Sequence, residues 1–256
     1  MSKYAILGAT GNCGLSILQL LSKSPDAHIN VLVRSRQKLE TSFPSLSSQT
    51  NITVFEGSIS DINTLSACLT GTRAAFLTVA VTENAPDTSI ALDTAKAVVS
   101  ALQDAKSKGN AKPPKLVVLS SASVDKKFWR NVPAFVHNIM WNANAYIYSD
   151  LVRAEEYLRR QEDWVDSVFA CPGGMTHDVQ KGHELSTENQ QTFLGWLDLA
   201  AGMIEMAEDA DGKWNGQRVS VVLKAGQKAR FERWAPLILS KGLLSYYVPW
   251  LCKWLP

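Results

Sequence analysis

Three glycines near the N-terminus stand at a spacing that suits phosphate binding. The segment Gly8-Ala-Thr-Gly11-Asn-Cys-Gly14 follows the apolar run 4–7 and opens a segment of helical periodicity, 15–21. Gly8 permits a tight strand-to-helix turn, Gly11 lets the backbone approach a pyrophosphate, and Gly14 allows close packing of helix on sheet. The free N–H groups at a helix N-terminus favour an anion there. The residues expected to bind a nucleotide cofactor are Gly8, Thr10, Gly11, Asn12, Cys13 and Gly14. The alternative is a glycine-rich turn without a ligand.

The residue after the second apolar run, 29–33, bears on which dinucleotide is bound. An acidic residue at this place binds the ribose 2′-hydroxyl of NAD. This chain has Arg34 there, and a guanidinium can form a pair of hydrogen bonds with a 2′-phosphate. The sequence therefore favours NADP(H), unless Arg34 is only a solvated loop charge. Ser58, Ile59 and Val79, at the ends of the third and fourth runs, are expected beside the adenine and its ribose.

A parallel sheet is needed to position these residues. Short runs of Val, Ile and Leu without alternation are typical of strands buried on both faces. The expected strands are 4–7, 29–33, 52–55, 74–79, 116–119, 165–170 and 219–223. The expected helices are 15–21, one that starts near Asp61 as its N-cap, 87–106, 148–160, 189–208 with a Thr187/Gln190 capping box, and 227–240. The fold class predicted from this alternation is α/β: a Rossmann-like doubly wound parallel sheet with helices on both faces and a small C-terminal substrate-side region.

The composition indicates one domain whose two halves differ. A chain of 256 residues with 46% hydrophobic and 20% charged residues can bury a large core and is not typical of disorder. The chain has eight tryptophans, and the first of them is Trp129. We therefore expect a single NAD(P)-binding domain over 1–256. Residues 1–123 would bind the dinucleotide, and residues 124–256 would complete the sheet and supply a substrate lid and a C-terminal cap.

Charge, segment lengths and cysteine spacing exclude several classes of function. The 26 basic and 24 acidic residues give a net charge of +2 without a block of like charge, so nucleic acid is not an expected partner. No run reaches the ~18 apolar residues of a transmembrane helix, and no signal peptide precedes the first strand. The four cysteines form no CxxC and no Cys/His ligand pattern. We therefore expect no metal site, no disulfide framework, and free thiols in the cytoplasm.

Longer motifs extend beyond the glycine loop. Gly-x-x-Gly-x-x-Gly, Arg34, the 57–61 turn and Ser120-Ser121 after the fifth strand resemble the NmrA-like branch of the atypical short-chain dehydrogenase/reductase superfamily. The segments starting at Tyr148 (YSDLVRAEEYLR), Cys171 (CPGGMTHD), Lys181 (KGHELS) and Phe193 (FLGWLDLAAGMIE) resemble the fungal averufin oxidase A-like family. This resemblance covers nearly the whole chain. It implies secondary metabolism and mycotoxin-type pathways to anthraquinones and xanthones, with a flat phenolic or quinone polyketide as substrate.

The catalytic pattern of that superfamily is incomplete here. Its reductases use Tyr-x-x-x-Lys, in which the lysine lowers the tyrosine pKa, together with a serine that positions the carbonyl. Four residues after Tyr146 stands Asp150, and four after Tyr148 stands Val152. Tyr148 fits the tyrosine position better and is expected to donate a proton or a hydrogen bond. Its alternative role is to pack on the Trp-rich segment.

Serine, histidine and tryptophan side chains complete the expected site. Ser121 or Ser123 would orient a substrate oxygen, and Ser120 would contact the cofactor or the backbone. Histidine titrates near neutral pH, and indole rings stack on flat ligands. The residues assigned to catalysis are Tyr148, Ser121 and His183, and those assigned to the substrate are Trp129, His137, Trp141, Gly174 and His177. The alternative is that the histidines only hydrogen-bond or pack the loops that carry them.

These residues favour an NADP(H)-dependent oxidoreductase, and the resemblance implies that it acts on an aromatic polyketide. Because the lysine is missing, two alternatives stay open: a non-redox isomerase or cyclase on the same scaffold, and a non-catalytic NmrA-like dinucleotide sensor. The aromatic tail 243–256 is too short to span a bilayer. We expect it to pack on the body or to form a homodimer contact, and its alternatives are to cover the pocket or to lie at a membrane interface.

Overall fold

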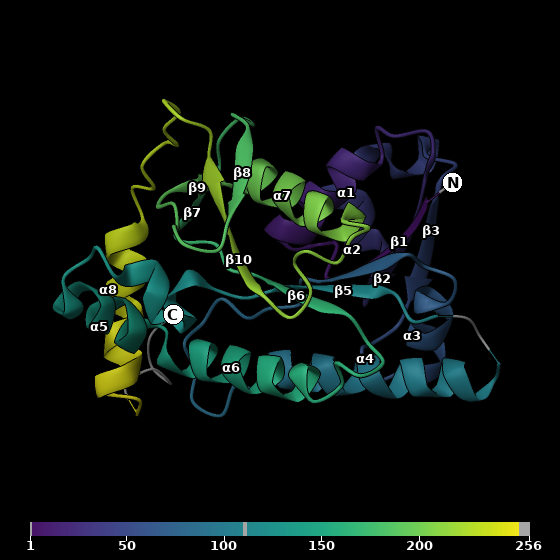
Figure 1. Ribbon diagram of the computed structural model, residues 1–256, viewed down its shortest axis with the longest axis horizontal. Coiled ribbons are helices and arrows are strands. Elements are labelled where there is room, and N and C mark those ends of the chain that lie inside the picture. The colour runs from purple at the N-terminus through teal and green to yellow at the C-terminus, as the bar shows by residue number, and fades with distance from the viewer. Residues whose placement is uncertain (1, 110–111, 251–256) are drawn as a thin grey trace.

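The centre of the fold is a largely parallel β-sheet that carries the glycine loop at its carboxyl edge. The structure is a computed structural model that describes residues 2–109 and 112–250 (Figure 1). Its strands are β1 (Ser2–Leu7), β2 (Ala27–Val33), β3 (Ile52–Glu56), β4 (Ala74–Leu77), β5 (Lys115–Leu119), β6 (Ser167–Ala170), β7 (Met175–Thr176), β8 (His183–Ser186), β9 (Leu194–Gly195) and β10 (Arg218–Leu223). Eight of these described strands form one sheet in the order β3-β2-β1-β4-β5-β6-β10-β8, and β7 pairs with β9.

The strand order changes direction between β1 and β4, as a doubly wound sheet requires. From β3 to β10 the described neighbours are parallel, and β8 runs antiparallel to β10 at the edge. Ligands of such sheets bind outside the carboxyl ends of the strands near this change of direction. The predicted Rossmann-like fold class is confirmed.

Helices cover both faces of the sheet. The α-helices are α1 (Asn12–Leu21), α2 (Arg36–Ser42), α3 (Ile62–Leu69), α4 (Ile90–Ser107), α5 (Ala134–Ala143), α6 (Ala145–Arg159), α7 (Trp196–Glu208) and α8 (Ala235–Tyr247), and the 3-10 turns are η1 (Pro44–Ser48), η2 (Ala122–Val124) and η3 (Lys126–Trp129). Helices α1 and α7 pack on one face, and α3, α4 and α6 pack on the other (Figure 1).

Strand β1 shows why the apolar runs lack alternation. Tyr4 and Ile6 point into the core beneath α1 and α7, whereas Ala5 and Leu7 point into the core beneath α3, α4 and α6. All four side chains are buried. Each face therefore needs apolar residues, and burial of a side chain the size of Ile or Leu contributes about 1.5–3 kcal/mol.

The predicted start of the helix after the sixth strand is wrong. The sequence predicted a helix from residue 189 with a Thr187/Gln190 capping box, but α7 begins at Trp196 with Gly195 as its N-cap. The residues before it run extended, because β9 pairs with β7 and the chain packs closely on the loop after β6. A Cβ atom at Gly173 in that loop would lie only 2.7 Å from the Thr192 hydroxyl.

Two helices near the C-terminal side also differ from prediction. The segment 123–145, which shows no helical period, contains α5. The helix predicted over 227–240 lies further along the chain, as α8 at Ala235–Tyr247. Pro236 at the first turn of α8 fixes its start. The period of α5 is hidden in the sequence because apolar side chains stand on its outward face, as Phe135 and Ile139 do, as well as on its inward face.

Asn84 joins α5, α6 and α8 at one end of the molecule. Its Oδ1 accepts the Tyr146 N–H at 2.9 Å, and its Nδ2 donates to the Gly242 carbonyl at 3.3 Å. The Ser245 hydroxyl donates to the Asn84 carbonyl. A Cβ atom at Gly242 would collide with the Ala143 carbonyl oxygen, so α8 lies directly on the end of α5.

None of the helices in the described ranges is long and apolar enough to cross a membrane. The last residues of the aromatic tail, 251–256, lie outside the described residues. The homodimer contact expected for this tail therefore stays a prediction.

Candidate functional site

The loop between β1 and α1 has the geometry of an anion-binding turn. Gly8 adopts a φ of +94°, which favours glycine, and its carbonyl accepts the Gly11 N–H at 3.0 Å. No side chain caps α1, so the N–H groups of Asn12, Cys13 and Gly14 have no partner within the helix. A Cβ atom at Gly11 would meet only the Gly8 carbonyl oxygen, at 3.5 Å. The loop thus offers free donors and open space, and it fits a dinucleotide pyrophosphate.

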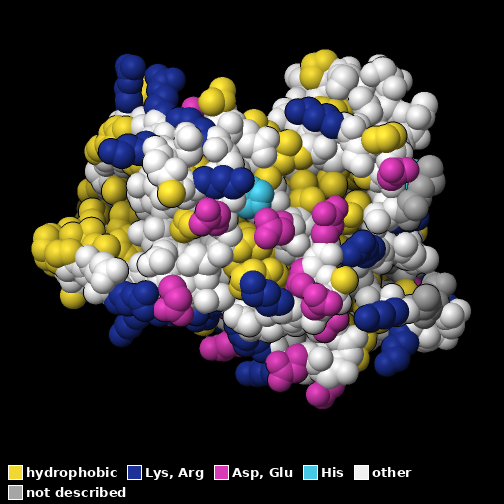
Figure 2. All heavy atoms as spheres, turned by 45° about the horizontal axis from the view of Figure 1, so that its top comes forward, with side chains coloured by type: hydrophobic (Ala, Val, Ile, Leu, Met, Phe, Trp, Pro, Cys, Tyr) yellow, Lys and Arg dark blue, Asp and Glu magenta, His cyan; other side chains and the backbone are white. Residues whose placement is uncertain are grey.

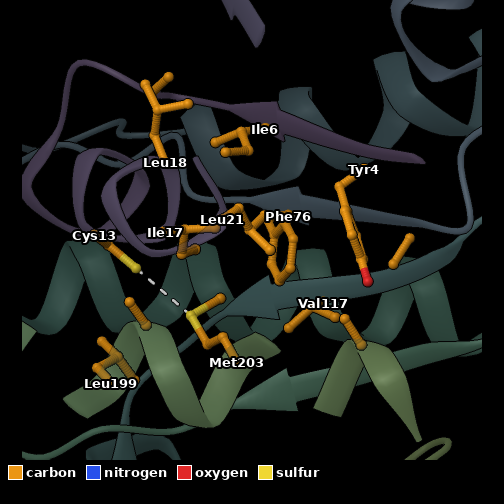
Figure 3. Packing of buried hydrophobic residues seen from close by; sticks show 14 of the residues in the cluster. Tyr4, Ile6, Cys13, Ile17, Leu18, Leu21, Phe76, Val117, Leu199 and Met203 are labelled. Atoms are coloured by element: carbon orange, nitrogen blue, oxygen red, sulfur yellow. Dashed lines mark hydrogen bonds between the residues drawn. The ribbon is translucent and has the colours of Figure 1, made fainter. Parts of the chain in front are cut away.

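The Cys13 side chain belongs to the core. Its Sγ lies 3.5 Å from Met203 Sδ of α7 (Figure 3). Burial raises the pKa of the Cys13 thiol to about 12. Only the backbone of Cys13 is therefore free to face a cofactor, next to the half-buried Thr10. Gly14 packs so closely that a Cβ atom there would lie 2.7 Å from the Thr78 hydroxyl.

Arg34 is exposed directly after β2, where the sequence predicts a 2′-phosphate contact. The neighbouring Arg36 forms an ion pair with Glu40 at 3.0 Å, one turn along α2. Glu56, at the end of β3, accepts the backbone N–H of Arg36 at 3.2 Å. This acid comes from a different strand, so the linear motif does not reveal it. Arg34 and Glu56 are thus the charged side chains at the ends of β2 and β3.

The turns after β3 and β4 lie along the same sheet edge. Ser58 is exposed and Ile59 is half-buried, and the Ser58 carbonyl accepts the Asp61 N–H at 3.0 Å. Asp61 caps α3 by accepting the Thr64 N–H at 3.2 Å, which confirms its predicted role. Hydrogen bonds from Thr64 hold the pKa of Asp61 below its ordinary value. Val79 lines a small cavity between the ends of β4 and β5.

Tyr148 meets two serines at the carboxyl end of β5. Its side chain is 8% exposed on α6, and Ser121 and Ser123 stand in the turn that follows β5. Burial raises the pKa of the Tyr148 phenol, and hydrogen bonds with Ser123 and Ser121 oppose this shift only in part. The phenol is therefore protonated at neutral pH. Tyr146 instead faces Tyr246 of α8, with ring centroids 6.3 Å apart.

The position of α6 that carries a lysine in the wider superfamily is occupied by a valine here, and the charged residues next to it bind the start of α4. Val152, four residues after Tyr148, is half-buried. Asp150 is buried and caps α4, because its carboxylate accepts the first backbone N–H groups of that helix at 2.8 and 3.4 Å. Arg153, the nearest cation on α6, donates to Asp150 at 3.3 Å. Its guanidinium is thereby engaged at the start of α4.

An aromatic row leads from Tyr148 across α5. The ring centroids of Tyr148 and Trp141 are 5.6 Å apart, those of Trp141 and His137 are 6.3 Å apart, and those of His137 and Trp129 are 5.3 Å apart. His137 Nε2 lies 3.2 Å from the Ser123 carbonyl oxygen, and the Trp129 indole N–H donates to the backbone of η2 at 3.1 Å. The structure thus brings together five of the predicted residues around one turn: Tyr148, Ser121, Trp129, His137 and Trp141.

A buried polar network lies behind this cluster. Ser120 Oγ donates to Glu155 Oε1 at 2.5 Å, and Glu155 Oε2 accepts from Arg218 Nε at 2.7 Å. Arg218 also lies 3.6 Å from Asp125. Glu155 is 1% exposed, so its charge requires this pairing. Ser120, which the sequence assigns to the cofactor or the backbone, therefore directs its hydroxyl to Glu155. The sequence did not predict the roles of Glu155 and Arg218, because β10, which carries Arg218, is remote from α6 in the sequence.

His183 lies on β8 at the edge of the sheet. Its Nε2 is 2.9 Å from a carboxylate oxygen of Glu205 on α7. Within the described residues no hydrogen bond or ring contact joins His183 to Tyr148 or Ser121, so its catalytic role stays a prediction. The described part of the chain also contains no group of three His, Cys, Asp or Glu residues placed to hold a metal.

Gly174 and His177 lie in the loop after β6. A Cβ atom at Gly174 would lie 3.2 Å from the Phe193 ring, so this glycine lets the loop approach β9. His177 is exposed, and its ring centroid is 6.3 Å from that of Trp196. Phe193 in turn meets Phe231 edge to face at 5.1 Å. The substrate contacts predicted for Gly174 and His177 stay predictions.

The doubly wound sheet and the uncapped glycine loop define a dinucleotide-binding protein of the Rossmann type. The chain belongs to the NAD(P)H-binding family, which it matches over residues 8–210.

Fungal proteins named oxidoreductases are similar over the full length. The chain is 41% identical to oxidoreductase AgnL4 of Paecilomyces divaricatus, over 100% of this chain and 98% of that protein. It is 43% identical to oxidoreductase nsrR of Aspergillus novofumigatus, over 99% of this chain and 96% of that protein. A short-chain dehydrogenase/reductase from Veillonella parvula, solved in complex with NADP, shares the fold with a TM-score of 0.68 at 19% identity, over 91% of this chain and 99% of that one.

Proposed function

We propose that this protein is an NADP(H)-dependent oxidoreductase that reduces a carbonyl of a flat aromatic polyketide of the anthraquinone or xanthone type. It would act in fungal secondary metabolism as an averufin oxidase A-like member of the atypical short-chain dehydrogenases/reductases. The observation that carries the proposal is the buried Tyr148 phenol, which lies with Trp141 at the turn of Ser121 and Ser123 after β5, on the sheet edge that presents the glycine loop. The names of the full-length relatives support redox chemistry.

The state of Tyr148 favours reduction over oxidation. A phenol whose pKa is raised by burial retains its proton at neutral pH, so it can donate but not abstract. NADPH, when bound at the glycine loop, would supply the hydride and be left as NADP⁺. As the carbonyl carbon accepts that hydride, Tyr148 Oη would give its proton to the carbonyl oxygen, and solvent would later restore it. Ser121 and Ser123 would hold the oxygen within reach of the phenol.

The aromatic row supports a flat substrate. Trp129, His137 and Trp141 lie next to one another on one side of Tyr148. Aromatic side chains of this kind stabilise planar ligands by stacked and edge-to-face contacts. Trp141 and Trp129 are half-buried, so part of each ring is available to a ligand.

Arg34 supports the preference for NADP(H). It is exposed at the end of β2, whereas the neighbouring Arg36 is engaged with Glu40. A free guanidinium at this place is suited to a 2′-phosphate. A cytoplasmic setting accords with the free, buried thiols of Cys13, Cys68 and Cys171 and stays part of the proposal.

A non-redox isomerase or cyclase is the second candidate, and the valine at position 152 favours it. Without a lysine beside Tyr148, the site lacks the residue that holds the nicotinamide ribose in the wider superfamily. The same protonated phenol would then serve a proton transfer without hydride. A dinucleotide sensor, the third candidate, would bind NADPH and turn over no substrate.

The test is consumption of NADPH with a panel of hydroxylated anthraquinones and xanthones, followed at 340 nm and by mass spectrometry of the products. We expect a reduced product, and we expect Tyr148→Phe to lower kcat by about 10²–10⁴-fold. Tyr146→Phe is the matched control, because that phenyl ring faces α8, and it should retain activity. Product formation without NADPH consumption would instead identify the isomerase, and NADPH binding without any turnover would identify the sensor.

A further inference from the structure

The end of the molecule formed by α5 and α8 presents a continuous apolar surface. Of the twelve large apolar side chains that are exposed in the described part of the chain, nine lie on these helices or next to the ends of α8. They are Phe135, Ile139, Trp234, Leu237, Ile238, Leu244, Tyr246, Tyr247 and Trp250, and we call them the α5–α8 surface. Figure 2 shows hydrophobic side chains gathered at this end of the molecule, on the left of the view. Patches of this kind mark interaction sites.

Helix α8 is oriented opposite to an ordinary surface helix. Its small and polar residues Gly242 and Ser245 face inward, against the end of α5 and Asn84. Several of its large apolar residues face outward, with Leu237 50% and Ile238 57% exposed, while Leu239 and Leu243 are half-buried. A helix that covers a core buries its apolar stripe. The exposed apolar stripe of α8 therefore indicates that this side of the helix contacts another apolar surface.

Helix α5 also exposes apolar side chains on its outer face. Its inward side chains, His137 and Trp141, belong to the aromatic row beside Tyr148. Its outward side chains Phe135 and Ile139 are 65% and 44% exposed. The fold and the site use only the inner face, so the outer face is available for binding.

The charges at this end point to the identity of the partner. Residues 131–149 contain no charged side chain, and residues 234–250 contain only Lys241. The segment that leads into α8, 224–233, holds four basic residues and one acidic residue. Arg230 and Arg233 in that segment are exposed, a few residues before the first outward side chains of α8. The apolar surface thus has a net positive border on the side of residues 224–233, while the exposed Glu83 lies beside Asn84 on another side.

We propose that the protein binds peripherally to membranes that contain anionic lipids, with the α5–α8 surface as its contact. The leucine, isoleucine and phenylalanine side chains would enter the acyl boundary, and Trp234, Tyr247 and Trp250 would lie at headgroup level. Arg230 and Arg233 would meet the anionic headgroups. A second copy of the chain is a poorer partner, because the same surface would bring further basic charge and no acidic side chain from either helix. The inference does not depend on which substrate the site takes.

The experiment is flotation of the full chain with phosphatidylcholine vesicles that contain or lack 30% phosphatidylserine. We expect binding that is stronger on the anionic vesicles and weakened by 0.5 M salt. The double variant Leu237→Glu/Ile238→Glu should weaken binding at least about tenfold, and Arg230→Gln/Arg233→Gln should weaken it about tenfold on anionic vesicles only. The control is Val179→Ser, because Val179 is 70% exposed outside this surface and the change adds no charge near Arg230, and it should bind as the unsubstituted chain does.

The variants change exposed positions, so their melting temperatures and NADPH binding should match those of the unsubstituted chain. The proposal is overturned if the full chain does not float with anionic vesicles, or if the Leu237→Glu/Ile238→Glu chain, folded by these measures, floats equally well. It is also overturned if sedimentation shows a dimer at micromolar concentration that these two substitutions dissociate, because the surface would then bind a second copy.

Discussion

Gly11 and Gly14 lie one helical turn apart, and replacing each by alanine separates helix packing from cofactor binding. At Gly14 a Cβ atom would lie 2.7 Å from Thr78 Oγ1 and 2.8 Å from the Gly8 carbonyl carbon. The second neighbour is backbone and cannot rotate away. At Gly11 the added carbon would meet only the Gly8 carbonyl oxygen, at the ordinary distance of 3.5 Å, and the backbone there is extended, with φ of −86° and ψ of 162°.

These distances set the expected magnitudes. Overpacking at Gly14 costs up to about 3 kcal/mol, and the better helix propensity of alanine returns about 1 kcal/mol. The net loss of about 2 kcal/mol would lower the Tm of a chain of this size by about 4–8 °C. At Gly11 the loss of an N-cap glycine costs about 0.5 kcal/mol, which lowers the Tm by no more than about 2 °C. The same methyl group would stand in the approach to the pyrophosphate, so the Kd for NADPH should rise at least about tenfold, or 1.4 kcal/mol.

The assay is thermal unfolding of each variant without cofactor, together with calorimetric titration of NADPH. Gly14→Ala should be clearly less stable, and Gly11→Ala should be nearly as stable as the unsubstituted chain but bind NADPH weakly. The reasoning fails if Gly11→Ala lowers the Tm as much as Gly14→Ala does, or if Gly11→Ala binds NADPH with unchanged affinity.

Three further predictions concern single features of the structure. Arg34→Ser should raise the Kd for NADPH about 10–100-fold and leave the Kd for NADH nearly unchanged, because a charge-assisted hydrogen bond contributes about 1.5–3 kcal/mol. If calorimetry shows that the binding of both cofactors is weakened equally, a contact between Arg34 and the 2′-phosphate is excluded. Asp150→Ala leaves two backbone N–H groups of α4 without their carboxylate, so the free energy of unfolding measured in urea should fall by about 1–3 kcal/mol. Ser149→Ala, at the exposed neighbouring position, should change it very little. Equal stability of the two variants would contradict the capping role. Burial raises the pKa of the Cys13 and Cys68 thiols from 9.0 to about 12, so the folded state retains these two protons at a pH where the unfolded chain loses them. The free energy of unfolding should therefore be unaffected by the two thiols below about pH 9 and should fall as the pH rises toward 12. Urea titrations should show a smaller fall in Cys68→Ala, and an identical fall in that variant would refute the assignment.

The sheet and the cofactor loop could be predicted because their determinants are local. A run such as 116–119 is apolar on both faces, and the glycines stand within seven residues of one another. The cap at Asp61 is equally local, since it binds the N–H group three residues later. Tyr148 and Ser121 could be brought together because a parallel sheet places the end of β5 next to the helix that follows it.

The remaining features depend on contacts between distant segments. The Ser120–Glu155–Arg218 network joins β5, α6 and β10, and no spacing in the sequence pairs a carboxylate with an arginine 63 positions away. The start of α7 depends on the pairing of β9 with β7, which overrides the local capping signal. Helix α5 escaped prediction because both of its faces carry apolar as well as polar side chains, so its sequence shows no helical period.

The most direct test of the proposed function is to follow deuterium from 4-deuterated NADPH, with both stereoisomers, into an anthraquinone or xanthone acceptor under single-turnover conditions. We predict that one stereoisomer transfers its label to the former carbonyl carbon, and that Tyr148→Phe slows this transfer at least about 10²-fold while Tyr146→Phe does not. Turnover of the acceptor without label in any product, or label transfer that is indifferent to Tyr148, would contradict hydride reduction assisted by the Tyr148 phenol.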